Sequence, residues 1–148
     1  MSKKAELEVA LKEAMKASDV VRKNTLRMTL AAVKEAEVQK RGDLDDAAVL
    51  AILQKEVKSR QEAINEAGKA NRPDLAEAAQ VEIAVLQDYL PQAMDAAELE
   101  AIVTAAIAEA GAASPADMGR VMKLVLPQLQ GRADGSQVSQ LVRDKLQS

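Results

Sequence analysis

The sequence contains no cysteine, histidine, tryptophan or phenylalanine, and Tyr89 is its single aromatic residue. The lack of cysteine excludes disulfides, zinc–thiolate sites and cysteine nucleophiles. The lack of histidine removes the side chain that most often serves as a general base or a metal ligand. Hydrophobic residues nevertheless make up 48% of the 148 residues. That share is too high for a disordered chain, and the length suits one domain or two small ones.

Long apolar segments are also missing. No uninterrupted apolar run reaches the ~20 residues that a membrane span needs. The first residues, from Met1 to Glu6, lead into a charged segment and not into the apolar region of a secretory signal. We therefore expect a cytoplasmic protein without a membrane partner.

The net charge of −3 conceals an uneven distribution. Residues 1–41 carry a net charge of +4 and residues 118–148 carry +3, whereas residues 42–90 and 91–117 each carry −5. Basic ends on an acidic chain can steer a polyanion to one surface. Helical bundles also carry mixed charged faces by default, so the pattern alone leaves both interpretations open.

Apolar residues recur with helical spacing along the whole chain, and no segment alternates apolar and polar residues over the length of a strand. The pattern predicts an all-α protein. We expect an N-terminal four-helix unit over residues 1–91 and a small C-terminal three-helix bundle over residues 92–148. Pro91 and the denser turn signals that follow it mark the boundary.

Capping and turn residues delimit the expected helices. Five residues are expected at helix starts, as N-caps or as proline in the first turn: Asp19, Asp45, Pro73, Asp95 and Pro115. Four are expected to end helices: Gly68, Pro91, Gly111 and Pro127. Ser136 is expected to cap the last helix.

No group of residues has the spacing of a catalytic or metal site. A calcium loop that began at Asp43 would need an acid or amide at its fifth position, glycine at its sixth and glutamate at its twelfth. Ala47, Ala48 and Gln54 stand at those positions. We expect no catalytic residues, no metal and no cofactor.

Glycines occur at two places near the C-terminus. In the segment from Gly131 to Ser136, the two glycines either supply left-handed turn conformations or let the backbone approach a phosphate at the start of the last helix. The chemistry alone favours the turn. Gly119 lies inside an expected helix, where it costs about 1 kcal/mol relative to alanine. Close helix packing is the favoured reason for it, and approach of the backbone to a ligand is the alternative.

Four segments resemble the GatB/YqeY family, in the same order as in free-standing YqeY-like proteins. The most specific begins with Asp117–Met122 and continues through Pro127 to Gly131–Gly135. The other three are Leu26–Met28, Lys55–Ile64 and Glu82–Pro91. The similarity covers nearly the whole chain.

This resemblance implies a function that the residues alone do not show. In the family, a related domain forms the tail of the B subunit of the Asp/Glu-tRNA amidotransferase, where it contacts tRNA. Related domains are appended to some bacterial glutaminyl-tRNA synthetases. The sequence covers only the tail-type region. It lacks the kinase-like domain of the amidotransferase and the Ser/Lys amidase centre of the partner subunit.

Three hypotheses follow, in order of preference. The first is an accessory tRNA-binding protein that holds tRNA by shape and phosphate contacts. The second is an interaction module that docks on an aminoacyl-tRNA synthetase or an amidotransferase. The third, a carbon–nitrogen ligase with glutamine as amido donor, is implied only by the resemblance. The expected RNA-binding residues lie in the basic C-terminal stretch: Gly119, Arg120, Lys123, Gly131, Arg132, Gly135, Arg143 and Lys145.

A second basic stretch lies near the N-terminus and consists of Lys12, Lys16, Arg22, Lys23 and Arg27. The sequence leaves open whether it joins the C-terminal basic surface. It also leaves the oligomeric state open.

Overall fold

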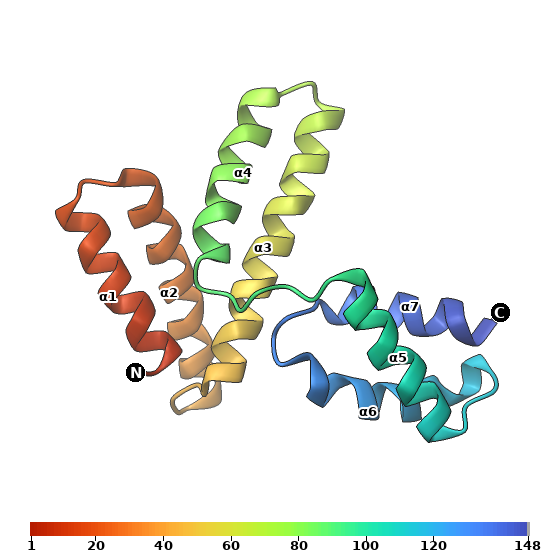
Figure 1. The fold of residues 1–148 in the computed structure, drawn as a ribbon. Coiled ribbons are helices and arrows are strands. Elements are labelled where there is room, and N and C mark those ends of the chain that lie inside the picture. The colour runs from red at the N-terminus through yellow and green to blue at the C-terminus, as the bar shows by residue number, and fades with distance from the viewer. Residues whose placement is uncertain (148) are drawn as a thin grey trace. The chain divides into compact units, whose positions relative to one another are not determined.

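The computed structural model describes residues 1–147, and every regular element in that range is helical (Figure 1). The prediction of an all-α protein is confirmed. The chain divides into two compact units, Met1–Pro91 and Gln92–Ser148, each with its own core.

The first unit contains the helices α1 (Lys3–Lys16), α2 (Val20–Lys40), α3 (Asp46–Lys69) and α4 (Pro73–Gln87). α1 packs along α2, and α3 and α4 form an antiparallel hairpin (Figure 1). Fully buried leucines from all four helices meet in the core: Leu7, Leu26, Leu53 and Leu86. Burial of each such side chain contributes roughly 1.5–3 kcal/mol.

The second unit contains α5 (Ala96–Ala110), a short 3-10 turn η1 (Pro115–Asp117), α6 (Met118–Leu129) and α7 (Gly135–Gln147). Each of the three α-helices contacts the other two. Its core is built largely from fully buried valines: Val103, Val121, Val125, Val138 and Val142.

Most helix starts lie where the sequence places them. The carboxylates of Asp19, Asp45 and Asp95 each accept a hydrogen bond from a backbone N–H three residues later. Pro73 occupies the first turn of α4. The three aspartates accept from N–H groups that a helix N-terminus leaves unpaired, and Pro73 has no N–H group to leave unpaired. These effects involve only neighbouring residues, so the local sequence determines where these helices begin.

Two helix ends differ from expectation and one agrees with it. α3 continues past Gly68 to Lys69, because the turn that follows is made by Asn71 with a positive φ of 55°. α4 ends at Gln87 and does not continue up to Pro91. A proline disfavours helical conformation at the residue before it, so the helix has to end before Pro91 is reached. Gly111 ends α5 with a φ of 65°, as predicted.

The predictions for Pro127 and Ser136 are wrong. Pro127 lies inside α6, where the helix continues to Leu129, which is 5% exposed in the core. This burial offsets the hydrogen bond that proline removes from the helix. Ser136 lies inside α7, because Asp134 takes the capping position: its carboxylate accepts from the N–H of Ser136 at 3.2 Å.

Candidate functional site

Arg120 joins the end of α5 to the start of α6. Its Nη2 donates to Oδ1 of Asp117 at 2.6 Å, and its Nη1 donates to the carbonyl oxygen of Ala110 at 3.1 Å. The other oxygen of Asp117 accepts from the backbone N–H of Ala113 at 3.0 Å. The segment Asp117–Met122 therefore begins with a pair that fastens the loop between α5 and α6.

These contacts lower the pKa of Asp117 below its ordinary value. The hydrogen bond from the N–H of Ala113 is the largest cause, and the bond from Arg120 is the second, since both stabilise the charged carboxylate. The side chain of Arg120 is 60% exposed. An anionic ligand could reach its guanidinium, but in competition with Asp117.

Arg132 fastens the other end of α5. Its Nε donates to the carbonyl oxygen of Gln92 at 2.8 Å, and its Nη2 donates to Oε2 of Glu98 at 2.9 Å. Its own carbonyl oxygen accepts from the N–H of Met94 at 2.9 Å. Gly131, just before it, has a positive φ of 77°, which is the turn conformation that glycine adopts without strain.

The remaining three predicted cations differ in their partners. Lys145 forms an ion pair with Glu100 at 3.0 Å. Arg143 donates to the amide oxygen of Gln140 at 3.1 Å. Within residues 1–147, neither Lys123 nor Arg143 forms an ion pair, and both are exposed. Two of the five cations are thus left for an external anion.

Gly119 is exposed, and a Cβ added to it would meet no atom within 4 Å. The favoured reason for this glycine, close helix packing, is therefore wrong. A Cβ added to Gly135, in the first turn of α7, would also meet no atom within 4 Å. Gly119, Lys123 and Leu126 follow the i, i+4, i+7 spacing of one helix side, and all three are exposed. We call these three residues the outer side of α6.

The N-terminal basic stretch is partly used within its own unit. Nη1 of Arg22 donates to the hydroxyl of Tyr89 at 2.6 Å, and Nη2 donates to Oδ2 of Asp88 at 2.7 Å. These bonds tie the start of α2 to the segment that follows α4. Arg22 therefore serves the structure of the first unit.

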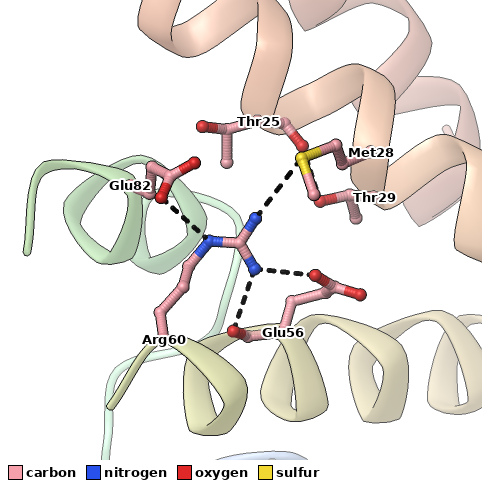
Figure 2. A network of polar contacts seen from close by, with 6 residues as sticks. All are labelled: Thr25, Met28, Thr29, Glu56, Arg60 and Glu82. Carbon is pink, nitrogen blue, oxygen red and sulfur yellow. Dashed lines mark hydrogen bonds and ion pairs between the residues drawn. The ribbon is translucent and has the colours of Figure 1, made fainter. Parts of the chain in front are cut away.

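Sequence reasoning missed a buried polar network around Arg60, which is only 6% exposed (Figure 2). Nη1 of Arg60 donates to the carbonyl oxygen of Glu56 at 3.1 Å and to its carboxylate at 2.7 Å. Nη2 lies 3.9 Å from the sulfur of Met28, and Nε lies 3.6 Å from Oε2 of Glu82. Three of the four family-like segments, Leu26–Met28, Lys55–Ile64 and Glu82–Pro91, thus meet at one guanidinium.

A signal for this network was present in the sequence. Arg60 lies seven residues after buried Leu53 and seven before buried Ala67, so it falls on the apolar stripe of α3. A charged residue on such a stripe is rarely buried without partners. The partners themselves come from α2 and α4, and helical spacing within α3 does not identify them.

Residues 1–147 contain neither a grouped metal site nor a membrane span. No three His, Cys, Asp or Glu side chains in this range are grouped closely enough to hold a metal ion. No helix in it combines the length and apolar character that crossing a membrane requires.

Comparison with protein families gives one match along nearly the whole chain. The model of a family described as Yqey-like protein covers residues 4–146. The match includes all four segments on which the resemblance was based.

The similar curated proteins are fungal. "Altered inheritance of mitochondria protein 41, mitochondrial" of Lachancea thermotolerans is 39% identical over 97 residues, which are 65% of this chain and 52% of that protein. The protein of the same name from Pyrenophora tritici-repentis is 30% identical over 141 residues, which are 93% of this chain and 77% of that protein. The chain thus spans about half the length of the Lachancea protein.

These names overturn the expected cytoplasmic location, which is wrong: the relatives are named as mitochondrial proteins. The absence of long apolar segments does not distinguish a cytoplasmic protein from a mitochondrial one. Mitochondrial transit peptides are amphipathic and rich in arginine, so they contain no long apolar run.

Proposed function

Because this chain belongs to the YqeY-like protein family, we propose that it is an accessory tRNA-binding protein linked to tRNA-dependent amidation or aminoacylation. The family is related to the tail domain of the amidotransferase B subunit. The observation that carries the proposal is the outer side of α6. There Gly119 and Lys123 are exposed one turn apart, and neither is used by the packing of the unit.

The chemistry of this side suits a phosphate backbone. Gly119 lies in the first turn of α6, where the helix dipole favours an anion and the absence of a side chain allows close approach. Lys123 on this side, and Arg143 on the neighbouring helix α7, supply charge that no acid of residues 1–147 neutralises. With Tyr89 as the single aromatic residue, stacking on bases contributes little, so recognition relies on shape and phosphates.

The predicted RNA-binding residues fall into two groups by their contacts. Arg120, Arg132 and Lys145 hold the unit together through carboxylates and carbonyls. They contribute to binding mainly by fixing the helices. Gly119, Lys123, Gly135 and Arg143 are the residues that we assign to direct contact.

The experiment is a titration of unfractionated tRNA with the full chain, followed by fluorescence anisotropy across a salt series. Replacing Lys123 or Arg143 with alanine should weaken binding and reduce the slope of log K against log salt by about 0.9 for each phosphate contact removed. Lys69→Ala, at an exposed lysine of the first unit, is the matched control and should leave the slope unchanged. Absence of any complex at low salt would refute the proposal.

A second candidate, docking on a synthetase or an amidotransferase, is favoured by Leu126. This side chain is 50% exposed on the same side of α6 as Lys123, and its apolar surface would gain from burial against a protein but not from contact with a phosphate. A purified glutaminyl-tRNA synthetase and nuclease-treated chain provide the test. A complex that survives nuclease treatment and is weakened by Leu126→Ser would replace the first proposal with the second.

A further inference from the structure

Two buried side-chain polar atoms in residues 1–147 have no hydrogen-bond partner, the hydroxyl oxygen of Thr25 and Nε of Arg60. Thr25 is fully buried in α2 and Arg60 is 6% exposed in α3. Both belong to the network of Figure 2. Buried polar atoms in folded proteins almost always have a protein or water partner, so this pair requires an explanation.

The two edges of the Arg60 guanidinium have different surroundings. Nη1 is satisfied by the carbonyl and the carboxylate of Glu56. The opposite edge has only the sulfur of Met28, 3.9 Å from Nη2, and Oε2 of Glu82, 3.6 Å from Nε. The second distance exceeds that of a hydrogen bond. In Figure 2, Thr25 and Glu82 lie on the Nε side of the guanidinium, away from Glu56.

The charge of the network restricts which partner Nε of Arg60 and the hydroxyl of Thr25 can share. One guanidinium already faces two carboxylates, Glu56 and Glu82. A further anion would therefore be repelled, and a cation would meet the Nε–H donor. A small neutral molecule that both accepts and donates hydrogen bonds satisfies every group.

We propose that Nε of Arg60, the hydroxyl of Thr25 and Oε2 of Glu82 form a binding site for one structural water molecule. The water accepts from Nε–H, donates to Glu82 and forms its third bond with the hydroxyl of Thr25. Three bonds are the usual number for a buried water. The water joins α2, α3 and α4 at the point where three family-like segments meet. This role is independent of tRNA binding.

A high-resolution crystal structure of the full chain tests the site directly. We expect one ordered water within about 2.7–3.2 Å of all three atoms. A direct hydrogen bond between Nε of Arg60 and Glu82, with no density for water between them and Thr25, would overturn the proposal.

Thr25→Val provides a second test whose sign distinguishes the alternatives. Valine keeps the volume of threonine and removes the hydroxyl. If the hydroxyl binds water, its removal lowers the thermal midpoint of the first unit; if the hydroxyl is truly unpaired, its removal raises the midpoint. Thr25→Ser retains the hydroxyl and should retain the water in its crystal structure. A raised midpoint for Thr25→Val, or loss of the water in Thr25→Ser, contradicts the site.

Thr29→Val is the matched control. Thr29 is as fully buried as Thr25 and lies one turn further along α2, but its hydroxyl donates to the carbonyl of Thr25 at 2.9 Å. That carbonyl lies four residues before Thr29, within its own helix. Thr29→Val should therefore leave the water near Arg60 in place. Its disappearance would show that the water depends on general packing and not on the three assigned atoms.

Discussion

Nε of Arg132 lies 2.8 Å from the carbonyl oxygen of Gln92, a residue forty positions earlier in the chain. Together with the ion pair to Glu98, this bond holds the segment before α5 against the loop between α6 and α7. Lysine has no planar fork and cannot reproduce both bonds. We expect Arg132→Lys to lower the free energy of unfolding of the second unit by about 1 kcal/mol. Hydrogen exchange of the amides in α5–α7 of the full chain measures this loss.

Arg143→Ala is the control for the Arg132 prediction. It also removes a positive charge from the second unit, but within residues 1–147 the bond that it breaks is the one to Gln140 on the same helix. Exchange in α5–α7 should be nearly unchanged. An equal loss in both variants would show that the effect is one of net charge and not of the Gln92 contact.

Gly119→Ala should raise the stability of the second unit and weaken its binding to tRNA. An added Cβ meets no atom within 4 Å, so alanine should raise the stability of α6 by about 0.5–1 kcal/mol through its higher helix propensity. The same methyl group should weaken tRNA binding, because it keeps a phosphate away from the backbone. Urea unfolding and the tRNA titration measure the two effects on one preparation.

Gly68→Ala is matched to this variant, since Gly68 also lies within a helix and has open space around it. It should raise the stability of α3 and leave tRNA binding unchanged. Unaltered tRNA affinity of Gly119→Ala would remove the contact that we assign to Gly119.

Asp117 should make the second unit sensitive to acid. Its folded-state pKa lies below the value in the unfolded chain, which is about 3.9. As pH falls, the carboxylate of Asp117 is therefore protonated in the unfolded chain before it is protonated in the folded protein. The contribution of Asp117 to the free energy of unfolding is complete above the unfolded pKa and is lost as pH falls through the folded pKa. Asp117→Asn should make stability between about pH 5 and pH 2 depend less on pH. Urea midpoints across this range test the prediction, and equally steep curves for both proteins would contradict it.

The sequence alone predicts the parts of the fold that depend on neighbouring residues. Asp45 and Asp95 cap their helices through a bond to an N–H three residues away, so the relevant partners lie within the motif itself. The end of α3 differs from the prediction by one residue for an equally local reason. Gly68 can adopt a left-handed conformation but does not need to, because Asn71 makes the turn.

The candidate site could be predicted less completely, because its charges are paired over long distances in the chain. Arg132 and Lys145 were correctly placed in a basic stretch, but their partners Glu98 and Glu100 lie 34 and 45 residues earlier. No spacing within α6 or α7 indicates that these cations are already neutralised. Family resemblance identifies the segments, whereas the contacts in the folded protein show which side chains in them are already paired.

Replacing Pro127 with alanine should stabilise the second unit. Proline inside α6 has no N–H to donate to the carbonyl four residues earlier, and its ring crowds that turn. We expect Pro127→Ala to raise the free energy of unfolding of the second unit by roughly 1–3 kcal/mol, up to the full penalty for proline in a helix interior. Pro73→Ala, in the first turn of α4, should give no gain, because proline suits that position and restricts the unfolded chain. Denaturant unfolding of both variants checks the contrast, and a similar gain at the two positions would show that the higher helix propensity of alanine, and not the interior position of Pro127, determines the result.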